Sequence, residues 1–203
     1  MLCLTVPTDA AWAPAALRHA DDVLVDHAHC EMKAASNALS LAARHPRSLA
    51  FVRAMTDLAR EEIDHYQRVI AILEVRGIPL GPPPVDVYAA ELRRAAQALP
   101  GCEIGPLADR LLVGALIEAR SCERFKLLAE VAASEPRLLE LRALWKELLA
   151  CEARHYRTFV DLAVQVADAD RPRVIARLEA LARVEGAIVA ALGAGATRAS
   201  VHG

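Results

Sequence analysis

The stretch Leu58-Ala59-Arg60-Glu61-Glu62-Ile63-Asp64-His65-Tyr66 contains a Glu and a His three positions apart, and Glu152 with His155 repeats that spacing ninety positions later. Residues three apart on a helix project from one face. A single pair of this kind is usually a surface contact. Two pairs, each inside an apolar helical pattern, predict a four-helix bundle with an interior metal site. In di-iron carboxylate bundles, two helices each supply Glu-x-x-His and the other two each supply a Glu.

Composition supports an all-α protein. The 203 residues are 55% hydrophobic but only 4% aromatic, so Ala, Leu and Val must build most of the core, and this favours packed helices over sheet. We find neither an apolar run long enough to span a membrane nor a secretory signal pattern. The five cysteines form no Cys-x-x-Cys pair, which fits reduced thiols. We therefore expect a cytoplasmic protein without a membrane partner.

Helix breakers divide the chain into segments. We expect one four-helix-bundle domain over residues 1–203, with a long crossover between helices two and three and an extra C-terminal helix. Pro46, Gly77, Ser134 and Pro136 mark helix ends, with Ser134 as an N-cap. The predicted core helices are 14–44, 47–76, 107–133 and 135–166, with a short helix at 88–98 in the crossover and the extra helix at 171–192. Residues 1–13 are expected to be a loose lead-in, and 193–203 a frayed tail.

The register of the first two helices selects a third carboxylate. Glu31 is the only acid between His27 and Arg44. In an antiparallel hairpin, residues equally far from the turn lie at the same height. Glu31 precedes Pro46 by 15 positions and Glu62 follows it by 16, so the two are expected to meet.

Two residues compete to be the fourth carboxylate, on the third core helix. A repeat favours Glu123, because residues 24–31 resemble residues 116–123. Height favours Glu118, because at 1.5 Å per residue Glu123 would lie about 10 Å too low to meet Glu152. Glu118 also follows an all-apolar run, where a buried carboxylate without a cation would be costly. We prefer Glu118 and interpret Glu123 as a solvated ion pair with its neighbouring arginines.

The predicted site thus has six ligands, which are carboxylates and imidazoles: Glu31, Glu62, His65, Glu118, Glu152 and His155. Such ligands suit iron or manganese, and four carboxylates balance two divalent cations. The residues beside them are assigned supporting roles. Cys30, Cys122 and Cys151 are interpreted as core packing, His27 and His29 as flanking histidines, and Glu61 as a residue that at most orients a histidine.

Four runs of the sequence resemble the tRNA hydroxylase family called MiaE. They are Asp26–Ser36, Ala59–Glu62, Ile117–Phe125 and Glu152–Tyr156. The Ile-Glu-Ala-Arg-Ser-Cys-Glu-Arg-Phe run is specific, and the similarity extends over roughly residues 15–165. The family is similar in fold to ferritin and to the di-iron quinone hydroxylases, whose helix-three Glu corresponds in local pattern to Glu118. The resemblance therefore supports Glu118 over Glu123.

The resemblance implies a function. The family hydroxylates the isopentenyl group of 2-methylthio-isopentenyl-adenosine in tRNA, which implies two iron ions, O₂ as co-substrate, and electrons from an external reductase or ferredoxin-like donor. For tRNA contact itself the residues offer only candidate arginine groups: Arg44, Arg47 and Arg53; Arg93, Arg94 and Arg110; and the pair Arg120 and Arg124. The net charge of −2 gives no general nucleic-acid signal.

Two other functions remain open from the sequence. A bundle of the same class could oxidise or hydroxylate a small molecule such as a quinone. A non-enzymatic iron-binding bundle is the other alternative, although iron storage requires a hollow shell, and a rubrerythrin-type peroxidase usually carries a Cys-x-x-Cys module that this sequence lacks.

Overall fold

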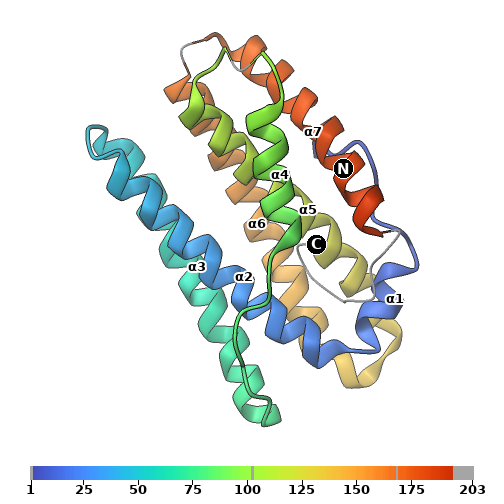
Figure 1. Ribbon diagram of the computed structural model, residues 1–203. Coiled ribbons are helices and arrows are strands. Elements are labelled where there is room, and N and C mark those ends of the chain that lie inside the picture. Colours follow the sequence, from blue (N-terminus) through green and yellow to red (C-terminus); the bar gives the residue numbers. More distant parts are fainter. Residues whose placement is uncertain (1, 102, 168, 194–203) are drawn as a thin grey trace. The chain divides into compact units, whose positions relative to one another are not determined.

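The chain forms helices joined by short turns and one longer connection, in a computed structural model that describes residues 2–101, 103–167 and 169–193 (Figure 1). No strand occurs in those ranges. The helices fall into two compact units. The hairpin unit is Arg18–Val85, and the main unit comprises residues 2–17 and 86–193 of the described chain. The prediction of one domain over 1–203 stays a prediction.

The hairpin unit consists of α2 (Ala20–Arg44) and α3 (Leu49–Arg76), which run antiparallel and pack along their length (Figure 1). The Ser48 side chain caps α3 by accepting a hydrogen bond from the Phe51 N–H. Gly77 ends α3 in the left-handed conformation, with φ 66°, which glycine adopts without steric cost. Both helix ends therefore agree closely with those predicted from Pro46 and Gly77.

The main unit is built on a second antiparallel pair, α5 (Pro106–Val131) and α6 (Leu139–Val166). Helices α4 (Val87–Ala98) and α7 (Arg171–Gly193) pack on each other and on α5. The first half of α5 is buried almost all round, as its uninterrupted apolar sequence predicted. Where Gly114 passes Phe159 of α6, an added Cβ would lie 3.1 Å from the ring, so a small residue is needed at that position.

Two predictions about the helix boundaries are wrong. The helix expected at 14–44 is interrupted at residues 18–19, so that α1 (Trp12–Leu17) packs on α5 in the main unit and α2 starts anew at Ala20. The acids Asp21 and Asp22 in the first turn of α2 favour a helix start there. Ser134 is not an N-cap, because it ends a 3₁₀ turn (Ala132–Ser134), and a second one (Pro136–Leu138) leads into α6.

The expected loose lead-in at 1–13 is also wrong for the residues described. The Thr5 hydroxyl donates to the carbonyl of Ala182, and Thr8 donates from both its N–H and its hydroxyl to Glu123. The segment passes so close to α7 that a Cβ on Gly186 would lie 2.7 Å from Val6 Cγ2. The predicted frayed tail lies outside the described residues from position 194 onward.

Candidate metal centre

The hairpin unit brings its three predicted ligands together. Glu31, Glu62 and His65 each offer one donor atom within 4.8 Å of the others, and all three are buried. His65 Nδ1 lies 3.3 Å from Glu62 Oε2 and 3.6 Å from Glu31 Oε2. We call this group the hairpin triad. The meeting of Glu31 with Glu62 that was expected from their distances to Pro46 is what α2 and α3 produce.

The main unit contains a matching group. Glu118 of α5 and Glu152 and His155 of α6 are buried, and each offers a donor atom within 4.8 Å of the others. His155 Nδ1 lies 3.1 Å from Glu152 Oε2, so the same ring nitrogen as in His65 faces the carboxylates. We call this group the main triad. The two triads share the composition of two carboxylates and one imidazole, each with an internal Glu-x-x-His.

Glu123 lies in a different environment from Glu118. It is 2% exposed and accepts hydrogen bonds from the Thr8 N–H, the Thr8 hydroxyl and the Arg120 guanidinium. Arg120 is fully buried and also forms a two-pronged contact with Glu185, at 2.8 Å for each nitrogen–oxygen pair. The predicted ion pair between Glu123 and a neighbouring arginine is present, but the expectation that it is solvated is wrong. Thr8 of the N-terminal segment bonds to Glu123, and Glu185 of α7 bonds to Arg120, so the pair is buried.

Arg124 is likewise buried and stacks over Trp12, with the guanidinium carbon 4.9 Å from the ring centroid. Burial lowers the pKa of Arg124 to about 10. Since Arg120 and Arg124 both lie inside the main unit, the pair is not available to contact phosphate, and that candidate for tRNA binding is wrong.

Two residues beside the triads make contacts that sequence reasoning only partly found. His27 lies one turn before Glu31 on α2, and its side chain is fully buried. Its Nε2 is 2.6 Å from Glu31 Oε1. This matches the expected flanking role, and the i, i+4 spacing was its signal. Cys151 Sγ lies 3.6 Å from His155 Nε2, the ring nitrogen opposite Glu152. The interpretation of Cys151 as core packing is therefore incomplete, because its thiol also contacts a predicted metal ligand.

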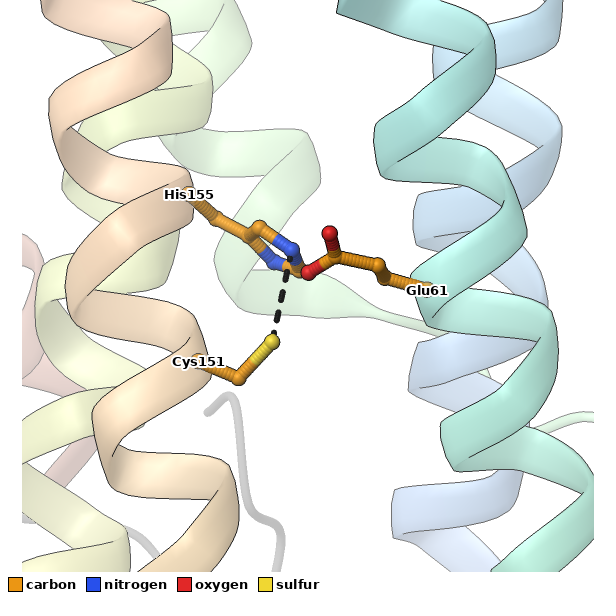
Figure 2. Close-up of side chains that lie close together, drawn as sticks. All are labelled: Glu61, Cys151 and His155. Carbon is orange, nitrogen blue, oxygen red and sulfur yellow. Dashed lines mark hydrogen bonds between the residues drawn. The ribbon is translucent and has the colours of Figure 1, made fainter.

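Figure 2 draws Cys151 and His155 one turn apart on α6, with the contact between them dashed. Glu61, drawn in the same view, belongs to α3 of the hairpin unit. Cys122, on α5, remains a buried thiol. Its burial, followed by the negative charges of Glu152 and Glu118, raises the pKa of the Cys122 thiol far above its usual range. A thiol held protonated in this way is a poor metal ligand.

Comparison with known proteins identifies the family. The family model described as tRNA-(MS[2]IO[6]A)-hydroxylase (MiaE) matches residues 1–197. The chain belongs to the MiaE family. The resemblance drawn from the four sequence runs is thereby confirmed, and so is the enzyme class, since the family is one of tRNA hydroxylases.

Curated relatives of this chain carry the same kind of name. A tRNA 2-(methylsulfanyl)-N(6)-isopentenyladenosine(37) hydroxylase from Pseudomonas putida is 45% identical over 166 residues, which are 81% of this chain and 77% of the relative. A protein of the same name from Salmonella typhimurium is 35% identical over 136 residues. Those residues are 66% of this chain and 46% of that relative, so this chain matches less than half of the Salmonella protein.

A solved structure shows the fold class. A Synechococcus protein, described as having aldehyde deformylating oxygenase activity, superposes with a TM-score of 0.84 at 39% identity, over 100% of this chain and 96% of its own. The fold class, all-α and ferritin-like, is confirmed. No helix among the described residues has the length and apolar character that crossing a membrane would require.

Proposed function

We propose that this MiaE-family chain is an O₂-dependent di-iron monooxygenase that hydroxylates the isopentenyl group of 2-methylthio-isopentenyl-adenosine in tRNA. The hairpin triad would supply Glu31, Glu62 and His65 as iron ligands, and the main triad would supply Glu118, Glu152 and His155, for two iron ions in all. The observation that carries the proposal is the repetition of one buried donor set, two carboxylates and an imidazole, in each unit.

The chemistry of these donors fits iron. Carboxylate oxygen and neutral imidazole suit iron and manganese, whereas a thiolate-seeking metal would find no deprotonated sulfur at Cys122. Burying several carboxylates close together is unfavourable unless cations or hydrogen bonds offset their charge. Four carboxylates match the charge of two divalent ions, which accounts for acids that would otherwise weaken the core.

Residues next to the triads fix the orientation of the ligands. Contact with His27 restricts the Glu31 carboxylate from the previous turn of α2. In metal sites a ligating histidine usually hydrogen-bonds through its other ring nitrogen to a supporting group, which sets its tautomer. With Nδ1 of His155 directed at Glu152, Nε2 is that other nitrogen, and Cys151 Sγ is its partner.

Iron bound at the triads would supply the oxidising power for C–H hydroxylation by O₂. The reaction inserts one oxygen atom into a C–H bond and reduces the other to water, which requires two electrons and two protons. We assign the electrons to a separate reductase or ferredoxin-like donor. The chain itself contributes a dry surrounding, since Ala115, Leu116 and Ala119 flank Glu118 on α5 and are fully buried.

The substrate assignment rests on the curated relatives, whose names specify the modified adenosine at tRNA position 37. We assign the protein to the cytoplasm, because a tRNA substrate is found there. The test is to load the protein with ferrous iron, add a competent reductant, O₂ and tRNA carrying the methylthio-isopentenyl base, and digest the product. We expect the modified nucleoside to gain about 16 mass units. An unchanged nucleoside under these conditions would refute the assignment.

A second candidate is supported by the Synechococcus structure, whose description names an aldehyde deformylating oxygenase. An activity of that kind would act on an aldehyde and release its formyl carbon. The discriminating experiment offers a long-chain aldehyde to the same reduced, iron-loaded protein and measures formate. Formate without any mass gain in the tRNA nucleoside would favour this candidate over the tRNA hydroxylase.

A further inference from the structure

The turn that joins α2 to α3 concentrates positive charge in an otherwise slightly acidic chain. Residues 32–56 contain no Asp or Glu, although the whole chain has 26 acids and a net charge of −2. Three arginines, Arg44, Arg47 and Arg53, lie on or beside this turn, and all are exposed. Glu31 is the last acid before this stretch, and Asp57 is the first acid after it.

These three arginines have no acidic partner among the described residues. The exposed Arg93, Arg157 and Arg183 share that property, but only the α2–α3 turn gathers three such arginines within ten positions of an acid-free stretch. Several arginines elsewhere do form ion pairs, as in Arg60 with Asp57 at 3.3 Å and Arg76 with Asp21 at 3.1 Å. Arg94, from the crossover group of candidates, pairs with Glu91. No acidic side chain in the part of the chain that the structure describes neutralises the charge at the α2–α3 turn, and this charge attracts an anion from solution.

The turn that carries the charge is well ordered by its own contacts. The His45 N–H closes the end of α2 on the carbonyls of Leu41 and Ala42, and Ser48 caps α3. The His45 ring lies edge-on to the buried Phe51 ring, with their centroids 5.7 Å apart. A fixed backbone of this kind lowers the entropy lost when arginines on it bind a ligand.

We propose that Arg44, Arg47 and Arg53 form a phosphate-binding surface for the backbone of a tRNA. Guanidinium groups bind phosphate oxygens through two parallel hydrogen bonds, and several of them on one turn can follow successive phosphates of one strand. This proposal rests on the proposed tRNA substrate and adds where that substrate docks. A single small anion would need one compact pocket, whereas these three side chains come from a helix end, a turn and the second turn of the next helix.

The spacing along the hairpin unit fits such a role. Thirteen residues of α2 separate Glu31 of the hairpin triad from Arg44, which is about 20 Å at 1.5 Å per residue. A nucleic acid strand covers that length in several nucleotides. Phosphates held at the turn would therefore anchor the tRNA at a distance from the modified base, without occupying the space around the triad.

The test measures binding of fluorescently labelled tRNA carrying the modified base, by anisotropy, over a series of salt concentrations. Each phosphate neutralised by the protein contributes about 0.7 to 0.9 to the slope of log affinity against log salt. The triple variant R44A/R47A/R53A is expected to bind about tenfold to a hundredfold more weakly near 0.1 M salt, with a slope shallower by about 2 to 3. The triple lysine variant should keep most of the slope, because lysine retains the charge.

The matched control is R60A, which removes an exposed arginine of α3 that already pairs with Asp57. It should bind like wild type, and iron content and far-UV circular dichroism should be unchanged in every variant. If the wild-type protein hydroxylates tRNA and the triple alanine variant binds it with unchanged affinity and slope, the proposed phosphate-binding surface is refuted and the proposed substrate is not. Wild-type protein that neither binds nor hydroxylates the tRNA would overturn the proposed substrate and this surface together.

Discussion

Replacing Glu123 with glutamine should destabilise the protein and leave its metal content intact. The carboxylate accepts hydrogen bonds from Thr8 and lies against the buried Arg120 guanidinium. Removing one partner of a buried ion pair costs about 3–5 kcal/mol. Arg120 keeps its contact with Glu185, so we expect the lower end, about 3 kcal/mol. For a chain of this size that corresponds to a melting temperature lower by about 6–12 °C.

Glu118→Gln should do the opposite. It removes one negative charge from beside Glu152, so the metal-free protein should melt at the same temperature as wild type or higher, while bound iron falls below two per chain. The assay is thermal unfolding of the metal-free forms by circular dichroism, paired with iron analysis after anaerobic loading. Glu130→Gln is the matched control on α5, because Glu130 is exposed and its pair with Lys126 is 3.8 Å long, so its loss should cost less than about 1 kcal/mol.

The contrast between the two glutamine variants is what tests the reasoning. If Glu123→Gln lost iron and kept its melting temperature, the assignment of Glu118 as the ligand would be refuted. If both variants lost iron equally, the conclusion that Glu123, with Arg120 and Glu185, acts independently of the main triad would be refuted instead.

Three further changes have definite expected outcomes. Gly186→Ala should lower the free energy of unfolding, measured by urea denaturation, by about 1 kcal/mol. The added Cβ would lie 2.7 Å from Val6, and the overpacking exceeds the gain in helix propensity. A more stable variant would contradict the close approach. Arg177→Ala should lower the free energy of unfolding by about 3–5 kcal/mol and speed amide hydrogen exchange at the end of α4. The reason is that Arg177 pairs with Asp109 and donates to three carbonyls at that helix end. Unchanged exchange would show that other contacts hold α4. Burial, then the neighbouring Glu185 charge, raises the pKa of Tyr88 well above its ordinary value. The folded state therefore binds more protons than the unfolded state above pH 10, and stability should fall by up to about 1.4 kcal/mol per pH unit there. Tyr88→Phe should flatten that decline in alkaline denaturant titrations, and an equal slope in both proteins would contradict the shift.

Much of the fold and of each triad could be predicted because the relevant signals are local. Helix breakers at Pro46 and Gly77 fixed the hairpin, and equal distances from one turn predicted that Glu31 would reach Glu62. The same counting placed Glu118 at the height of Glu152, and the structure brings Glu118, Glu152 and His155 within 4.8 Å. The spacing of residues along one helix, and their distances from the turn to the next helix, can both be counted in the sequence.

The features that were missed depend on distant parts of the chain. Arg120 and Glu123 are three apart on a helix, which usually indicates a solvated pair. Their burial follows from Thr8 and Glu185, which lie 112 and 65 positions from Arg120. The break between α1 and α2 has no proline or glycine to mark it; it arises because α1 packs on α5 while α2 packs on α3.

The tryptophans are distributed unevenly between the two units. The chain has only Trp12 and Trp145, and both belong to the main unit, one beneath Arg124 and the other fully buried on α6. Tryptophan fluorescence therefore reports on the main unit alone, whereas far-UV circular dichroism reports on the helices of both. Comparing the two signals during denaturation would reveal whether the triads are lost in one cooperative step or one after the other.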